Sequence, residues 1–143
     1  MLLCNYHNDD CVKFSDNYEG QVDSVVTDPP YGIEYLGNDW DSYQNCIAFK
    51  KSTWESISKP LKPGGYLVIF GASKTFHRLT CAVEDSGLKI KDVLMWLYGQ
   101  GMPKSQNIGK KDPAWKGWGT GLKPCYEPIL LAQKPISEKT IVK

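Results

Sequence analysis

Long hydrophobic runs are missing from this 143-residue sequence. A helix needs about 18 apolar residues to span a bilayer, and the longest apolar run, at positions 93–98, has only the length of a strand. The opening residues, MLLCNYHNDD, do not place a basic segment before an apolar one, as a signal peptide would. We therefore expect a cytoplasmic protein with no membrane partner.

An excess of charge of one sign is also lacking, and metal ligands are scarce. Lysine and arginine number 17 against 16 acidic residues, so any affinity for nucleic acid must come from a local patch. The five cysteines are odd in number and scattered, which favours reduced thiols. Cys4, His7 and Cys11 lie close together, but a structural zinc ion takes four ligands and His77 is the one other histidine. We expect no metal site.

The residues that are present are typical of one globular domain. Hydrophobic residues make up 41% of the chain and 13 glycines add to them, which argues against disorder or collagen and supports a single domain over residues 1–143. Asp41 and Gln44 are placed as a capping box for a helix. Strand-like and helical patterns alternate, with strands predicted at 22–27, 66–70, 91–98 and 128–132 and helices at 43–61 and 73–87. This alternation predicts a three-layer α/β domain with a mostly parallel sheet, its strands buried on both faces.

A basic and aromatic loop is predicted at 101–123, where neither the helical nor the strand period is visible. Its charge is +4, because Asp112 alone opposes five lysines: Lys104, Lys110, Lys111, Lys116 and Lys123. Trp115 and Trp118 lie among these lysines. Cations and aromatic rings together suit contact with phosphates and stacking on bases, so we expect Lys104, Trp115, Lys116 and Trp118 to contact nucleic acid. A solvated surface loop is the alternative.

The sharpest motif is TDPPYG at positions 27–32, directly after a predicted strand. Open α/β sheets bind their ligands at the carboxyl ends of their strands. Two prolines make a stiff turn without N–H donors, so the oxygens around it are rigidly aimed acceptors. The Asp28 carboxylate and the Pro29 carbonyl would accept from the amino group of a nucleobase, localise its lone pair and hold it facing a methyl donor. Tyr31 could stack on a base flipped out of a duplex.

The segment VVTDPPYG resembles the catalytic motif of the S-adenosylmethionine-dependent amino methyltransferases that act on DNA. LKPGGYLVIFGA, MWLYGQGMPKS and GTGLKPCYEPILLAQKP resemble later segments of the same family, especially in phage and bacterial members. The resemblance implies a Rossmann-like methyltransferase fold, S-adenosylmethionine as cofactor and DNA as partner, as in restriction-modification. It carries Asp28, Pro29, Pro30 and Tyr31 over as the catalytic and target-base residues.

The resemblance also assigns residues outside this motif. Asp10 and Cys11 match a Gly-Asp-Cys stretch that opens many members, which implies contacts to the cofactor alongside Asp28; a solvated acidic surface is the alternative for Asp10. Tyr98 and Trp96 alternate on one face of a predicted strand, in a region that helps to line the target-base pocket. For Trp96, packing under a helix is the alternative. An aspartate in the first motif position favours adenine N6 over cytosine N4.

The glycine-rich turn that cradles the cofactor in this family, Phe-x-Gly-x-Gly, is missing. Residues 117–121, GWGTG, imitate its spacing but stand between neither strand nor helix, so we interpret them as loop. The chain resembles the first, catalytic half of permuted family members. We therefore expect an incomplete fold, a truncated or split methyltransferase with little activity alone, which forms a homodimer or pairs with a complementary C-terminal half. The alternatives are a non-catalytic DNA-binding or interaction module and a methyltransferase for RNA or protein.

Overall fold

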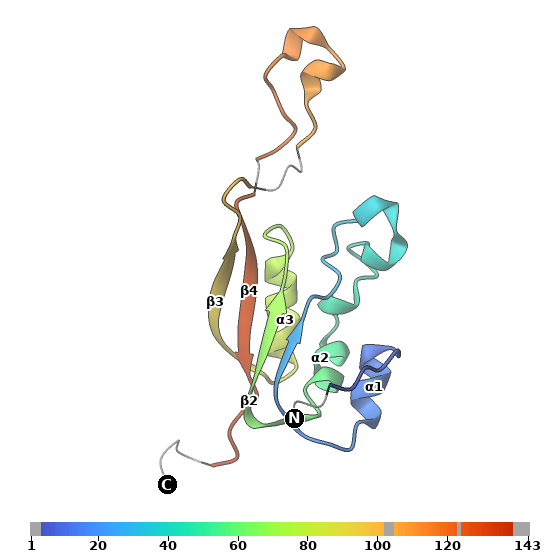
Figure 1. Cartoon of the computed structure of the whole chain (residues 1–143), viewed down its shortest axis with the longest axis vertical. Coiled ribbons are helices and arrows are strands. Elements are labelled where there is room, and N and C mark those ends of the chain that lie inside the picture. Colours follow the sequence, from blue (N-terminus) through green and yellow to red (C-terminus); the bar gives the residue numbers. More distant parts are fainter. Residues whose placement is uncertain (1–3, 102–104, 123, 139–143) are drawn as a thin grey trace.

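The computed structural model describes residues 4–101, 105–122 and 124–138. Within these ranges a sheet with strand order β1-β2-β4-β3 forms the centre (Figure 1). Its strands are β1 (Val22–Thr27), β2 (Leu61–Phe70), β3 (Lys89–Leu97) and β4 (Tyr126–Gln133). The helices are α1 (Cys11–Asn17), α2 (Lys51–Ile57) and α3 (Phe76–Asp85), with short 3-10 helices at Tyr35–Gly37, Asp39–Asp41, Ile47–Phe49, Ile108–Lys110 and Pro113–Trp115. None of the helices in the described ranges is long and apolar enough to cross a membrane.

The carboxyl ends of β1, β2 and β3 and the amino end of β4 lie at the same edge of the sheet, which we call the functional edge. β1 and β2 pair in parallel, whereas β4 pairs antiparallel with both β2 and β3. The predicted α/β class is right, but the sheet is mixed rather than mostly parallel, because β3 and β4 form a long antiparallel hairpin that the chain inserts beside β2. β1, β2 and β3 therefore run in the same direction, and their carboxyl ends lie beside the amino end of β4.

One face of the sheet carries the hydrophobic core. Leu67 and Ile69 of β2 and Leu130 of β4 are fully buried there, because alternate residues of a strand point to the same side. They pack with Trp54 of α2 and Val83 of α3 in a single cluster. Helices α2 and α3 therefore form the layer that covers this face.

No helix of the described residues covers the opposite face. Val26 is 68% exposed and Trp96 56% exposed, and Tyr66, Leu94 and Phe70 lie on the same side by strand alternation and register. We call these five residues the open face. The prediction of strands buried on both faces within three layers is corrected here, because the described residues form two layers. A contiguous apolar surface of this kind is typical of an interaction site.

The single helix predicted at 43–61 is wrong. Within that range the chain makes a 3-10 turn and then α2, which begins at Lys51. Asp41 does not cap a helix, because its buried carboxylate binds backbone N–H groups after the 27–32 turn instead. Cys46 has non-helical backbone angles and its thiol donates to the same turn. Both residues are tied to the turn, so regular helix starts only after them.

The remaining boundaries shift by a few residues. α3 begins at Phe76 rather than at Ser73, because the hydroxyl of Thr75 is used in a contact with the 27–32 turn and does not cap the helix. Gly87 ends this helix as predicted, with a φ of +91° that favours glycine. β2 begins at Leu61, five residues before the predicted strand, and therefore takes in the segment Pro63-Gly64-Gly65.

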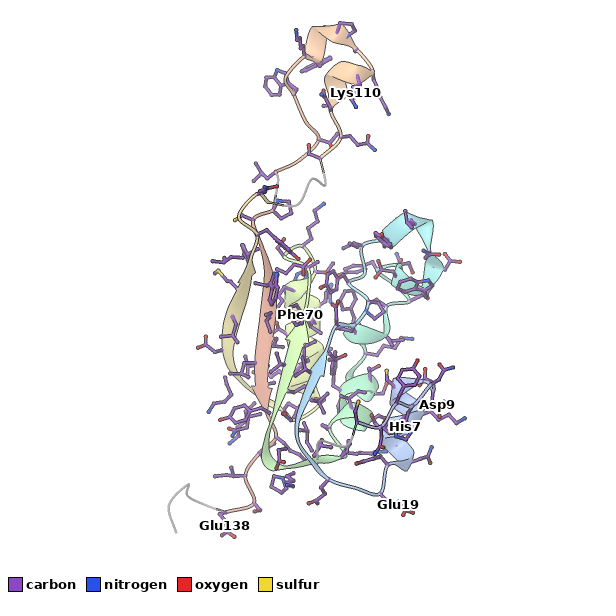
Figure 2. The ribbon with its side chains drawn as sticks, in the orientation of Figure 1. His7, Asp9, Glu19, Phe70, Lys110 and Glu138 are labelled. Carbon is purple, nitrogen blue, oxygen red and sulfur yellow. The ribbon has the colours of Figure 1, made fainter. Side chains whose placement is uncertain are left out.

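Residues 105–122 form an arm that extends beyond the ends of β3 and β4 (Figure 1). Lys110 lies near its tip, far from Phe70 on the sheet (Figure 2). The arm contains two 3-10 turns and a β-bridge between Asn107 and Gly119, so the predicted absence of regular helix and strand holds for its described residues. The GWGTG segment lies on this arm, where it neither follows a strand nor precedes an α-helix, which confirms its interpretation as loop.

Candidate active site

The turn at 27–32 begins where β1 ends, at the functional edge of the sheet. Asp28 is exposed, so its carboxylate faces solvent. Gly32, at the other end of the turn, is buried with a φ of +66°, and a Cβ there would overlap the ring of Phe49. Glycine is required at this position because the backbone approaches the core so closely. The turn thus lies against the core at one end and is open at the other.

The carbonyl oxygens of the turn have different surroundings. The Pro30 carbonyl accepts a hydrogen bond from the Cys46 thiol at 3.2 Å, and the Tyr31 carbonyl accepts one from the Thr75 hydroxyl at 2.6 Å. Among the described residues, no protein group donates to the Pro29 carbonyl. Of the carbonyls of Pro29, Pro30 and Tyr31, that of Pro29 therefore remains available as an acceptor. The Asp28 carboxylate precedes it in the sequence.

Two phenols and two carboxylates meet at this edge. The Tyr31 hydroxyl lies 3.5 Å from Oε2 of Glu127, the second residue of β4. Burial raises the pKa of the Tyr31 phenol, and a hydrogen bond to Asp28, its charge and the charge of Glu127 raise this pKa further. Loss of contact with solvent and a hydrogen bond to Glu127 also raise the pKa of Tyr98. Both phenols therefore stay protonated around neutral pH and can donate hydrogen bonds.

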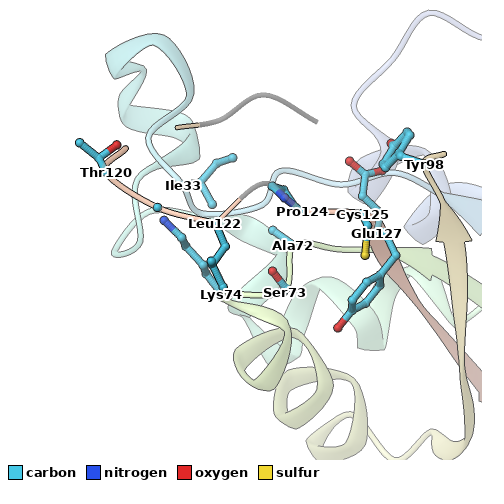
Figure 3. Close-up of a pocket in the computed structure, with 12 residues that line it drawn as sticks. Ile33, Ala72, Ser73, Lys74, Tyr98, Thr120, Leu122, Pro124, Cys125 and Glu127 are labelled. Carbon is cyan, nitrogen blue, oxygen red and sulfur yellow. The ribbon is translucent and has the colours of Figure 1, made fainter. Parts of the chain in front are cut away.

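A cavity of about 670 Å³ opens beside this cluster (Figure 3). Tyr98 lines it from just after β3, Glu127 from β4, Ser73 and Lys74 from the loop after β2, and Leu122 from the base of the arm. Its volume lies within the range of pockets that hold small ligands, roughly 300–1,000 Å³. Apolar walls with a few polar groups are what the recognition of a planar heterocycle requires.

Trp96 and Tyr98, which the sequence predicts on one face of a strand, lie in different surroundings. Tyr98 lies just beyond the end of the strand and lines the cavity. Trp96 lies on the open face instead, where its ring centroid is 6.2 Å from that of Phe70. Packing under a helix, the alternative for Trp96, does not occur within the described residues, because this side chain is 56% exposed.

Asp10 and Cys11, the residues assigned to the cofactor by resemblance, lie at the start of α1. Oδ1 of Asp10 accepts hydrogen bonds from the backbone N–H groups of Val12 and Lys13, so Asp10 is the N-cap of this helix. Cys11 is exposed. Neither residue lines the cavity, and Asp28, the third residue assigned to the cofactor, does not line it either.

The arm presents two predicted nucleic-acid contacts as a pair. Trp115 and Trp118 meet edge to face, with 5.9 Å between ring centroids, and remain 49% and 64% exposed. Lys116 lies between them in the sequence and is exposed. Asp112 caps the 3-10 turn that carries Trp115, so the one acidic residue of the predicted loop has a structural contact. Lys104 lies outside the described residues.

Glu127 is a residue of the site that the sequence pattern does not predict, and Asp41 has a role other than the predicted one. Glu127 lies next to a predicted strand, and its position at the functional edge follows only from the reversed direction of β4. The sequence pattern predicts Asp41 as a helix cap, although its buried carboxylate has a different function here. In the described residues no group of three histidine, cysteine or acidic side chains is arranged to hold a metal ion.

An α/β sheet with an Asp-Pro-Pro-Tyr turn and a cavity at its functional edge agrees with the α/β methyltransferase fold that the motif's resemblance implies. A protein-family model described as a DNA methylase, for N6 and N4 methylation, matches residues 22–142. The chain therefore belongs to the N6/N4 DNA methylase family.

Similar proteins include curated type II methyltransferases and solved structures. The chain is 26% identical to M.HindIII of Haemophilus influenzae over 184 aligned residues, which cover 94% of the chain and 59% of M.HindIII. It is 30% identical to M.HpaI of Haemophilus parainfluenzae over 100 residues, covering 65% of the chain and 31% of M.HpaI. Among solved structures, the protein TTHA0409 of Thermus thermophilus superposes with a TM-score of 0.62 at 20% identity, covering 94% of this chain and 56% of that one.

The M1.HpyAVI complex with S-adenosylmethionine gives a TM-score of 0.59 at 20% identity, covering 93% of this chain and 53% of that chain. These two likenesses show the fold. The chain thus spans little more than half the length of M.HindIII and of the two solved structures.

Proposed function

We propose that this chain provides the catalytic half of a methyltransferase that transfers a methyl group to the N6 atom of adenine in DNA. The observation that carries the proposal is the exposed Asp28, which lies close to Tyr31 and next to the Pro29 carbonyl, to which none of the described residues donates. None of the three lines the cavity at the functional edge, but the Tyr31 hydroxyl lies 3.5 Å from Glu127, which does. An aspartate at this motif position favours adenine N6 over cytosine N4, by resemblance to the family.

The chemistry follows from the acceptors in the turn. The lone pair of an exocyclic amino group is delocalised into the aromatic ring, so the nitrogen is a poor nucleophile. Hydrogen bonds from its two hydrogens to the Asp28 carboxylate and the Pro29 carbonyl would favour a tetrahedral nitrogen with a localised lone pair. The ring of Tyr31 provides a face for the base once it has left the duplex. Tyr98 is placed to line the pocket that receives it.

The proposed methyl donor is S-adenosylmethionine, which supplies a methyl group on a sulfonium centre when bound. The described residues fit the acceptor side of such a site, because the Asp28 carboxylate is exposed and carries the opposite charge to a sulfonium. They contain no glycine-rich turn between a strand and an α-helix to hold the donor's methionine end. We therefore expect the 143 residues alone to bind this cofactor weakly.

A complementing segment that carries the glycine-rich turn is the proposed partner. Two features of the chain favour it: the open face is apolar, and β1 is an edge strand with one side unpaired in the described sheet. A segment that adds strands to β1 and helices over the open face would bury both. A second copy of this chain is the competing partner for the same surfaces.

The arm is the proposed DNA contact. Trp115 and Trp118 offer exposed rings for stacking, and Lys116 offers a cation between them. The arm projects from the functional edge, next to the cavity (Figure 1). Phosphate contacts and stacking there would hold DNA without reading its sequence.

The test combines the chain with a fragment of a relative that carries the glycine-rich turn. We expect methyl transfer to DNA from labelled S-adenosylmethionine with both parts present and almost none with this chain alone. Analysis of the product nucleosides should give N6-methyladenine; N4-methylcytosine would contradict the adenine assignment. Asp28→Ala should abolish transfer, whereas Asp23→Ala, an exposed carboxylate on the same strand, should not. Calorimetry that found micromolar cofactor binding by the chain alone would contradict the need for a partner.

A non-catalytic DNA-binding module is the second candidate, because the arm presents its tryptophans independently of the turn. It predicts DNA binding that survives Asp28→Ala and no methyl transfer with any complementing fragment.

A further inference from the structure

Asp41 binds the backbone where the catalytic turn ends, although it lies outside the motif. Its side chain is 2% exposed. Oδ1 accepts from the N–H of Gly32 at 2.7 Å, and Oδ2 accepts from the N–H of Tyr35 at 2.9 Å and of Ile33 at 3.3 Å. One carboxylate thus gathers the backbone donor of Gly32, the last residue of the turn, and two donors of the loop that follows it.

This loop is held in a conformation that its residues do not favour. Glu34 and Leu36 have φ values of 56° and 54°, in the left-handed region that non-glycine residues rarely adopt. The N–H of Glu34 donates to the Asp41 carbonyl at 2.8 Å, so Asp41 holds the loop through both its backbone and its side chain. Strained backbone of this kind persists where the surroundings determine it, and it gathers at functional sites.

Cys46 and Thr75 complete the restraint from two other elements. The Cys46 thiol and the Thr75 hydroxyl donate to two successive carbonyls of the turn, at 3.2 Å and 2.6 Å. These two carbonyls are thereby occupied by donors of the protein, while the Pro29 carbonyl receives no donor from the described residues. We call Asp41, Cys46 and Thr75 the clamp.

We propose that Asp41 is the principal positioning residue of this clamp. The clamp determines which oxygen atoms of residues 28–31 face the target amine. This inference rests on the proposed function and deepens it, since a target amine needs two acceptors at fixed positions. The clamp leaves the Asp28 carboxylate and the Pro29 carbonyl for this purpose and removes the next two carbonyls from competition.

The first experiment needs no enzymatic activity. Amide hydrogen exchange of the chain, followed by NMR, compares Asp41→Asn with Asp39→Asn, an exposed aspartate in the same 3-10 helix. The amides of Gly32, Ile33 and Tyr35 should exchange about tenfold faster or more in the first variant, because charge-assisted bonds are lost, and remain unchanged in the second. Unchanged exchange in a folded Asp41→Asn variant would overturn the proposal.

The second experiment measures methyl transfer by the chain with its complementing fragment. Asp41→Asn should lower kcat about tenfold or more while KM for DNA stays within about twofold, because the acceptors are misplaced but the arm is intact. Loss of thermal stability with an unchanged kcat well below Tm would show a structural role alone and overturn the proposal.

If Asp41→Asn does not fold, Thr75→Val and Thr75→Ser test the clamp instead. Valine removes the hydroxyl that binds the turn and should lower kcat, whereas serine retains the donor and should restore it. Equal rates for both variants would overturn the clamp. If the unmodified pair transfers no methyl group at all, the proposed function fails, and the exchange experiment still decides whether Asp41 holds the turn.

Discussion

The hydroxyl of Tyr31 lies 3.5 Å from Oε2 of Glu127, although 96 positions separate the two residues in the sequence. Tyr31 follows β1 and Glu127 belongs to β4, so the contact exists only because β4 runs opposite to β1 and begins where β1 ends. The pair therefore couples the catalytic turn to the base of the arm. Any ligand that displaces the Tyr31 ring must also alter the surroundings of the Glu127 carboxylate.

This coupling predicts late titration of the Tyr31 phenol. Burial and the nearby carboxylates raise its pKa above the ordinary value of 10.0, because ionisation would bury a negative charge and place it beside the carboxylates of Asp28 and Glu127. Tyrosine ionisation followed by ultraviolet absorbance should include a component that is lost in Tyr31→Phe. This component should titrate at lower pH in Asp28→Asn and in Glu127→Gln, but not in Glu19→Gln, whose exposed carboxylate lies on another part of the chain.

The same shift determines the sign of the pH dependence of stability. A phenol with a raised pKa in the folded state contributes stability that is fully present below its unfolded pKa, about 10, and is lost as pH rises through the folded value. The free energy of unfolding should therefore fall above about pH 10. Tyr31→Phe should show a shallower alkaline decline in urea unfolding, and an equally steep decline would contradict the assignment.

Removing a charge from the arm should change the salt dependence of DNA binding. If Lys116 contacts a phosphate, Lys116→Gln should reduce the slope of log K against log salt concentration by about 1. Lys51→Gln, which removes a lysine paired with Glu55 on α2, should leave the slope unchanged. Fluorescence anisotropy of a labelled duplex at several salt concentrations measures both slopes. Equal slopes for the two variants would indicate that the arm is a solvated loop.

Removing an indole should weaken binding in a different way. Trp118→Ala should lower the affinity for single-stranded DNA by about 1–3 kcal/mol, because an exposed ring is lost as a stacking surface. Tyr6→Ala is the control, since this ring is 87% exposed and lies outside both the arm and the cavity. Equal losses in the two variants would show that stacking on Trp118 does not hold the strand.

A core substitution tests the packing between sheet and helices. Leu130 of β4 is fully buried, so Leu130→Ala should lower the free energy of unfolding by about 2–5 kcal/mol. Leu97, which is 71% exposed at the end of β3, should tolerate alanine within about 0.5 kcal/mol. Urea denaturation of the three proteins measures the difference. Similar values for the two variants would contradict this location of the core.

Local chemistry made the catalytic turn predictable from the sequence. An aspartate and two prolines after an apolar run define a stiff turn, and the exposed Asp28 at the end of β1 agrees with that reasoning. Gly87 was equally predictable as a helix stop, because its positive φ is a property of the residue itself. Features of this type depend on a few consecutive residues.

The features that were missed depend on contacts between distant segments. Tyr43, Ile47, Trp54 and Ile57 have helical spacing, yet Asp41 and Cys46 bind the turn and prevent a helix before α2. The position of β4 between β2 and β3 also follows from non-local pairing, which strand composition does not encode. Glu127 was missed for this reason, because its place at the functional edge requires the direction of β4.

The open face provides the sharpest test of the proposed partner. Leu94 and Met95 are neighbours on β3, 45% and 60% exposed, but strand alternation places Leu94 on the open face and Met95 on the other side. If a complementing segment covers the open face, Leu94→Lys should weaken its binding about tenfold or more, because a charge replaces apolar surface that would be buried. Met95→Lys should leave binding within about twofold. Titration of a labelled fragment followed by anisotropy measures both, and equal effects would place the partner elsewhere. Sedimentation of the chain alone tests the competing homodimer, which predicts that Leu94→Lys also dissociates the chain into monomers.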